Sequence, residues 1–98
     1  MAKFLLAYRA PKVYSPGPTV MEDWNGYFAS LGSGLVDIGD PVFDRFTVGG
    51  DVADTVLGGY SVIVADDIEA AVALANGCPL LAAGGAVEVG AITQLDRS

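Results

Sequence analysis

The stretch YSVIVADDIEAAVALA (residues 60–75) decides the fold. Its first part, YSVIVA, is apolar and rich in β-branched residues, which predicts a buried strand. Its second part repeats apolar residues at the spacing of an amphipathic helix. Asp66 with Glu69 predicts a capping box where that helix begins, and Gly77 followed by Pro79 predicts where it ends. A strand is therefore expected to lead directly into a helix.

The first third of the chain repeats this order. Phe4–Tyr8 is a short apolar run that predicts a strand. Thr19 with Glu22 predicts the capped start of a second amphipathic helix, and Gly32 predicts its end. Two strand–helix units of similar size are therefore expected.

The remaining segments complete the sheet. Leu35–Ile38 predicts a strand, Val42–Val48 resumes an extended pattern, and the stretch from Gly49 to Gly59 is expected to be irregular. The alternation over Val87–Ile92 predicts the last strand. The order strand, helix, strand, strand, helix, strand is that of a ferredoxin-like α+β sandwich with an antiparallel sheet. We expect a single domain over residues 1–98.

Composition restricts the function. The chain has 5 Lys and Arg, 12 Asp and Glu, and no histidine, for a net charge of −7. So few, scattered cations argue against nucleic acid as a partner. Without histidine the chain lacks the commonest general base and the commonest metal ligand. Because 52% of the residues are hydrophobic, a domain this small cannot hide all its apolar surface, and we expect a homodimer formed through the open sheet face.

Cofactor and membrane signals are weak. The paired glycines fit no nucleotide-binding loop, and helix capping explains the Asp66, Asp67 and Glu69 cluster without a metal. Phe4–Tyr8 is shorter than a signal-peptide core or a membrane span. The single cysteine, Cys78, allows no intramolecular disulfide and fits a reducing interior. We expect no cofactor, no membrane association and a cytoplasmic location.

Three stretches of the chain resemble the YCII-related domain family and cover nearly the whole chain in the family's order. They are Met1–Tyr8, Trp24–Pro41 with its Val36-Asp37-Ile38-Gly39-Asp40-Pro41 run, and Leu57–Val89 with its Gly77-Cys78-Pro79 run. The resemblance implies a dimeric ferredoxin-like α+β barrel. It also implies small-molecule chemistry, because a few relatives act on chlorinated aromatic breakdown products such as chloromuconolactones.

The family has been proposed to use a His–Asp pair in a cleft beside the sheet. By the resemblance, Asp37 matches the aspartate. The histidine has no counterpart, because the matching part of the first helix reads Glu22-Asp23-Trp24. The Asp-Gly-Pro-Phe signature of a related subgroup is also missing, and Asp51-Val52-Ala53-Asp54 stands near its place.

Four residues are candidates for a site, and each has a structural alternative. Asp37 is a candidate proton carrier, because burial would raise the pKa of a carboxyl; alternatively it accepts backbone hydrogen bonds from the turn at Gly39. Arg9 could hold a ligand carboxylate in two hydrogen bonds, or be an exposed strand-end charge. Trp24 could stack on a flat ligand, and Tyr60 could turn its hydroxyl into a cleft; alternatively both pack in the core.

Three hypotheses for the function remain. The first is a cofactor-independent enzyme acting on a small hydrophobic, carboxylated or lactone-like molecule, with Asp37 as the catalytic group. The second is a non-catalytic protein that binds such a molecule. The third is a dimerisation or interaction module.

Overall fold

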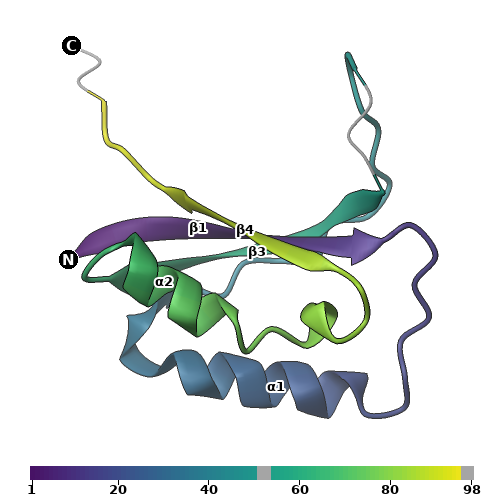
Figure 1. Ribbon diagram of the computed structural model, residues 1–98, viewed down its shortest axis with the longest axis horizontal. Helices are drawn as coiled ribbons and strands as arrows, with labels where there is room; N and C mark the ends of the chain where they lie inside the picture. Colours follow the sequence, from purple (N-terminus) through teal and green to yellow (C-terminus); the bar gives the residue numbers. More distant parts are fainter. Residues whose placement is uncertain (51–53, 96–98) are drawn as a thin grey trace.

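Four antiparallel strands form one sheet in the order β2-β3-β1-β4. The computed structural model describes residues 1–50 and 54–95. The elements are β1 (Ala2–Pro11), α1 (Val20–Leu31), η1 (Gly32–Gly34), β2 (Leu35–Asp37), β3 (Thr55–Ala65), α2 (Ile68–Ala75), η2 (Pro79–Leu81) and β4 (Ala86–Ala91). This strand order, with both helices below the sheet in Figure 1, confirms the predicted ferredoxin-like fold.

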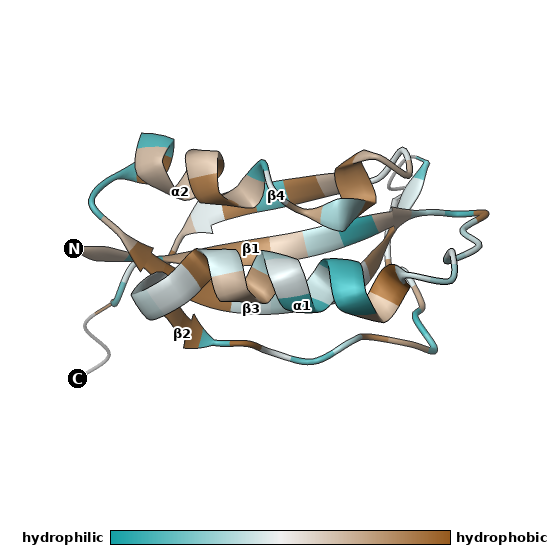
Figure 2. Ribbon diagram, turned by 90° about the horizontal axis from the view of Figure 1, so that it is seen from below, coloured by the Kyte–Doolittle hydropathy of each residue, from teal (hydrophilic) through white to brown (hydrophobic). Residues whose placement is uncertain are grey.

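Alternation along the central strands separates the two faces of the sheet. Phe4, Leu6 and Tyr8 of β1 are buried, and so is Ile63 of β3. These side chains face the helices, which both lie over the same face of the sheet in Figure 2. The intervening residues of β1 and β3 point to the opposite face, which no helix covers. The core therefore lies in a single layer between sheet and helices.

The helix boundaries differ in detail from the prediction. Thr19 precedes α1, but its hydroxyl donates to the Asp23 carboxylate at 3.1 Å instead of accepting from the helix backbone. Asp67, and not Asp66, caps α2 by accepting from the amide of Ala70 at 2.8 Å. Helix α2 ends at Ala75, and the next residue, Asn76, is in the right-handed region; Gly77 does not have a positive φ, so the predicted left-handed cap there is wrong.

The sheet differs more strongly from the prediction. The expected extended segment Val42–Val48 forms no strand, although Pro41 makes an isolated bridge with Gly59. The region expected to be irregular before Gly59 belongs to β3, which begins at Thr55. The register of β1 against β3 shifts between Tyr8 and Arg9, where β3 carries an extra residue. This bulge lets the glycine pair continue the strand, which a local reading of paired glycines does not predict.

Two segments project from the face that the helices leave open (Figure 1). We call residues 42–50, which follow β2, the β2–β3 arm. The other segment is residues 92–95, which follow β4. Both carry exposed apolar side chains: Phe46 and Val48 on the first are 90% and 91% exposed, and Leu95 on the second is 62% exposed. The open face is therefore flanked by apolar surface.

Candidate functional site

The predicted site residues lie on different faces of the sheet. Trp24 packs against Tyr8, which points toward the helices. Arg9 is the next residue along β1 and points the other way, and Tyr60 shares that open face because it pairs with Ala7. The structure therefore does not bring Trp24 together with Arg9 and Tyr60 around one ligand.

Trp24 belongs to an aromatic cluster between α1 and the sheet. Its ring centroid lies 5.1 Å from that of Tyr8, 5.7 Å from Tyr27 and 5.6 Å from Phe28. The contacts with both tyrosines are edge-to-face, the favourable arrangement for aromatic rings. The indole thus fills the space between helix and sheet.

The polar groups around this cluster are buried and paired. The hydroxyl of Tyr8 donates to that of Tyr27 at 3.3 Å, and Ser61 donates to the carbonyl of Ile38 at 2.7 Å. Burial raises the pKa of the Tyr8 phenol, partly offset by a hydrogen bond with Ser61, and burial raises the pKa of Tyr27 more strongly. Burial likewise raises the pKa of the Cys78 thiol. At neutral pH these groups keep their protons and hold the fold.

Asp37 lies at the exposed end of β2. Its Oδ1 accepts a hydrogen bond from the amide of Gly39 at 2.9 Å. Gly39 has a φ of +73°, and a Cβ there would overlap the carbonyl oxygen of Tyr60. The carboxylate thus braces a turn that only glycine fits. Asp37 is exposed, whereas the predicted role as a proton carrier required a buried carboxyl group.

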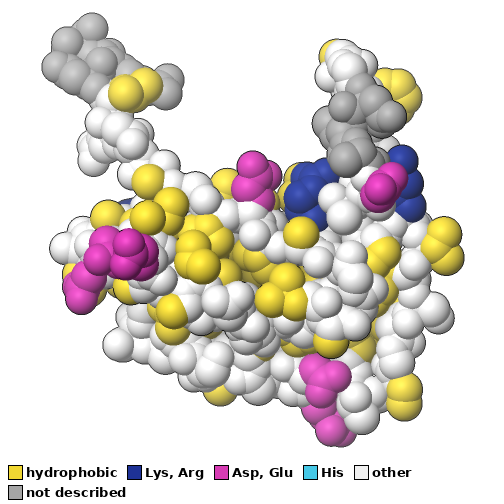
Figure 3. Space-filling view, in the orientation of Figure 1, with side chains coloured by type: hydrophobic (Ala, Val, Ile, Leu, Met, Phe, Trp, Pro, Cys, Tyr) yellow, Lys and Arg dark blue, Asp and Glu magenta, His cyan; other side chains and the backbone are white. Residues whose placement is uncertain are grey.

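A cavity of about 430 Å³ opens where the β2–β3 arm leaves the sheet. We call it the Arg9 cavity. It is lined by Arg9, Val42, Arg45, Phe46, Thr47, Thr55, Val56 and Leu57. Figure 3 shows basic side chains gathered at the base of this arm, with an acidic side chain beside the outermost. Two guanidinium groups and several apolar walls thus share one opening.

Thr55 fixes the guanidinium of Arg9. The Nε of Arg9 donates to Thr55 Oγ1 at 2.9 Å, and its Nη2 donates to the Thr55 carbonyl at 3.2 Å. Both acceptors are neutral, so these two hydrogen bonds do not offset the positive charge. A guanidinium has five N–H donors in a rigid plane, and Thr55 accepts from two of them. Within residues 1–50 and 54–95 nothing else accepts from the edge formed by Nη1 and Nη2, whose geometry suits a carboxylate held in two parallel hydrogen bonds.

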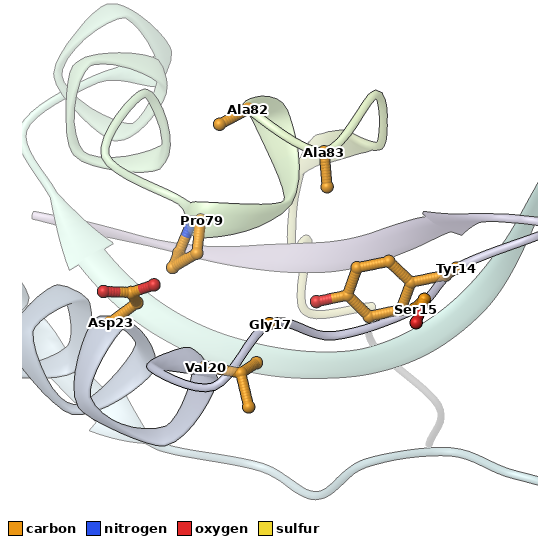
Figure 4. Close-up of a pocket in the computed structure, with 8 residues that line it drawn as sticks. All are labelled: Tyr14, Ser15, Gly17, Val20, Asp23, Pro79, Ala82 and Ala83. Atoms are coloured by element: carbon orange, nitrogen blue, oxygen red, sulfur yellow. The ribbon is translucent and has the colours of Figure 1, made fainter.

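A smaller hollow of about 210 Å³ lies between the start of α1 and η2 (Figure 4). Its lining is Tyr14, Ser15, Gly17, Val20, Asp23, Pro79, Ala82 and Ala83. The carboxylate of Asp23 projects beside Pro79, and the Tyr14 ring lies on the other side of the hollow. It contains an anion and no cation, so its charge does not suit an anionic ligand.

Arg45, Phe46 and Thr55 line the Arg9 cavity but were not among the predicted site residues. Nothing local marks them, because only the fold brings residues 42–47 and 55–57 to the end of β1. Of the Asp51–Asp54 stretch, Asp51, Val52 and Ala53 lie outside the described residues. Within residues 1–50 and 54–95, no three Asp, Glu or Cys side chains are grouped as metal ligands require. No helix in the described part of the chain is long and apolar enough to cross a membrane.

Comparisons with known proteins give the family. No curated protein matches this sequence. A solved structure that resembles it is 5-chloro-2-hydroxyhydroquinone dehydrochlorinase (TftG) from Burkholderia phenoliruptrix AC1100, in complex with 2,5-dihydroxybenzoquinone. The two share 20% identity with a TM-score of 0.52, over 98% of this chain and 95% of the other, which supports the fold alone. The YCII-related domain matches residues 1–96, and the chain therefore belongs to the YCII-related domain family.

Proposed function

We propose that this protein binds a small hydrophobic carboxylate in the Arg9 cavity, without a cofactor. The observation that carries the proposal is the guanidinium of Arg9, which Thr55 orients through two neutral acceptors at the wall of an apolar cavity. A charge-assisted, two-point hydrogen bond orients a carboxylate, and Val42, Phe46 and Leu57 offer apolar contact to the rest of the ligand. The structural neighbour complexed with a dihydroxybenzoquinone supports a ligand of similar size.

Binding is favoured over catalysis by the chemistry that the chain offers. It has no histidine, and the hydrogen bond from Gly39 gives the Asp37 carboxylate a complete structural role. Asp37 remains the candidate for any catalytic step. An Asp37→Asn variant separates the two: as a binder, the protein keeps its ligand affinity and neither form turns the ligand over. Turnover by the wild type that the variant loses, with binding intact, would make the protein an enzyme.

The test of binding is a thermal-shift screen in which each hydrophobic acid is paired with its methyl ester. The ester keeps the shape and loses the charge. At about 100 times its dissociation constant a ligand stabilises by about 2.7 kcal/mol, which for this chain length raises Tm by roughly 10 °C. Acids that shift Tm while their esters do not support the proposal. Equal shifts for acid and ester, or no shift for any acid, would contradict it.

We further propose that residues 1–98 form a single domain that dimerises through the open face of the sheet. The solvent-accessible surface is 6642 Å² and the radius of gyration 14.1 Å. A compact monomer of this size exposes roughly 5,200 Å² and has a radius of about 12.6 Å. This excess of roughly 1,400 Å² includes the two segments that project from the open face, and a standard interface buries ~800 Å² of each partner. The face also carries Lys3 and Glu88, so a second copy offers each charge an opposite partner.

The oligomeric state tests this part of the proposal. Light scattering on the wild type should give about twice the 10.0 kDa chain mass. Val62 lies on the open face opposite Leu5. A Val62→Asp variant should run as a monomer, because it places an unpaired charge in the interface. A wild type that is monomeric at micromolar concentration would contradict the dimer.

The dimerisation module stays as the second candidate function, favoured by the same open face if no acid binds. We also propose a cytoplasmic location, supported by the lone buried Cys78, which a reducing compartment leaves as a free thiol.

A further inference from the structure

The β2–β3 arm brings a second guanidinium to the Arg9 cavity. Arg45 lines the cavity from the arm, and its Nη1 donates to the carbonyl of Val42 at 2.7 Å. Asp44 has a φ of +55°, in the left-handed region that residues other than glycine rarely adopt. This turn folds Arg45 back toward Val42, so that both line the opening.

The charge of Arg45 is not offset by this contact, because the Val42 carbonyl is a neutral acceptor. Among the described residues only the Val42 carbonyl accepts from Arg45, which has four further N–H donors to offer a ligand. Two like charges beside one cavity repel each other, and because Arg45 and Phe46 are exposed, solvent screens part of that repulsion. An occupant that carries two negative groups removes that repulsion, whereas a monoanion offsets only half of the positive charge.

The walls between the cations fix the chemistry of the middle of the ligand. Val42, Phe46 and Leu57 present apolar surface, and the cavity of about 430 Å³ is within the size range of sites for small molecules. Such walls favour a hydrocarbon or aromatic centre over a polar one.

Resting on the proposed carboxylate site, we infer that the ligand is a dicarboxylate with an apolar centre. Arg9 binds one carboxylate through its Nη1 and Nη2 edge, and Arg45 binds the other. Thr55 and the Val42 carbonyl position the two guanidiniums. The arm thus determines specificity, because it supplies the second cation and the Phe46 wall.

The experiment uses three diacids: benzene-1,2-, benzene-1,3- and benzene-1,4-dicarboxylate. Each is titrated by calorimetry beside its own monomethyl ester, which has nearly the same shape and one charge fewer. For at least one isomer the diacid should bind about threefold to fivefold more tightly than its monoester, as expected for one additional charge pair with the exposed Arg45. In Arg45→Gln that preference should fall to about twofold or less, because the second contact is lost.

Lys12→Gln is the matched control. It removes the same unit of charge from the same end of β1, but Lys12 is exposed and does not line the cavity. Its preference for the diacid should remain as in the wild type. Three results would overturn the dicarboxylate assignment. The preference for the diacid could survive in Arg45→Gln, it could be lost equally in Lys12→Gln, or it could never exceed twofold in the wild type. If neither diacids nor monoesters bind, the proposed Arg9 site itself is wrong. If the monoesters bind through Arg9 but the diacids bind no more tightly, only the dicarboxylate inference is refuted.

Discussion

Gly39→Ala is predicted to be the most damaging single-methyl substitution near the site. Gly39 has a φ of +73°, and a Cβ there would overlap the carbonyl oxygen of Tyr60 in β3. The backbone must therefore move away from β3. That movement breaks the hydrogen bond from Ser61 to the Ile38 carbonyl and the one from the Val42 amide to the Gly58 carbonyl.

The loss of stability predicted for Gly39→Ala has two parts. A left-handed conformation costs an alanine about 1–2 kcal/mol by itself. Two lost hydrogen bonds add about 1–3 kcal/mol, at about 0.5–1.5 kcal/mol each. Gly49→Ala is the matched control, because Gly49 has a φ of +97° and nothing lies within 4 Å of its Cβ position. It should lose only the conformational part.

The assay is urea unfolding of both variants at one fixed protein concentration, because the proposed dimer would make stability depend on concentration. Gly39→Ala should be at least about 1 kcal/mol less stable than Gly49→Ala, which for this chain length is roughly 4–8 °C in Tm. It should also bind carboxylates more weakly, since Val42 begins the arm that lines the Arg9 cavity. Equal destabilisation by the two substitutions would refute the close approach to Tyr60.

Three further predictions concern the site, a helix cap and the buried hydroxyls. Thr55→Val removes the Oγ1 acceptor of Arg9 Nε and should weaken carboxylate binding about threefold to tenfold in calorimetry with the fold unchanged; unaltered affinity would contradict the positioning role. Asp67→Ala should cost about 1 kcal/mol in urea unfolding and Asp66→Ala much less, because only Asp67 caps α2; the reverse order would contradict this. Burial raises the pKa of Cys78, Tyr8 and Tyr27 above ordinary values of 9.0 for the thiol and 10.0 for the phenols, so the unfolded chain loses these protons first. The free energy of unfolding should therefore be highest below about pH 9 and fall as pH rises beyond it. Urea unfolding from pH 8 to 11 should show a shallower fall for Tyr27→Phe than for the wild type, and an identical fall would contradict the raised pKa of Tyr27.

The fold follows from the sequence because hydrophobic periodicity is a local property. The apolar run within residues 60–65 and the helical stripe after it are confirmed as β3 and α2. The predictions fail where pairing over long distances decides. Gly58 and Gly59 look like a loop in isolation, but pairing with β1 carries them into β3 through a bulge. After Pro41, the extended pattern over Val42–Val48 finds no strand to pair with, because the arm turns away at Asp44.

The candidate site is harder to predict from the sequence than the fold, because strand alternation and chain topology determine which side chains meet. Tyr8 and Arg9 are adjacent in sequence and point to opposite faces, which separates Trp24 from Arg9. Arg9 could be named as a candidate carboxylate ligand from its type and its place in a strand, with an exposed strand-end charge as the alternative. Arg45 carried no local signal, since only the fold places it in the lining of the same cavity as Arg9.

The most direct test of the central claim is a crystal structure with the acid that binds most tightly in the screen. The carboxylate is predicted to lie within hydrogen-bond distance of Nη1 and Nη2 of Arg9, with Thr55 still holding the Nε side of the guanidinium. The apolar part of the acid should contact Val42, Phe46 or Leu57. An acid bound in the hollow between α1 and η2, or one whose carboxylate makes no contact with Arg9, would contradict the account.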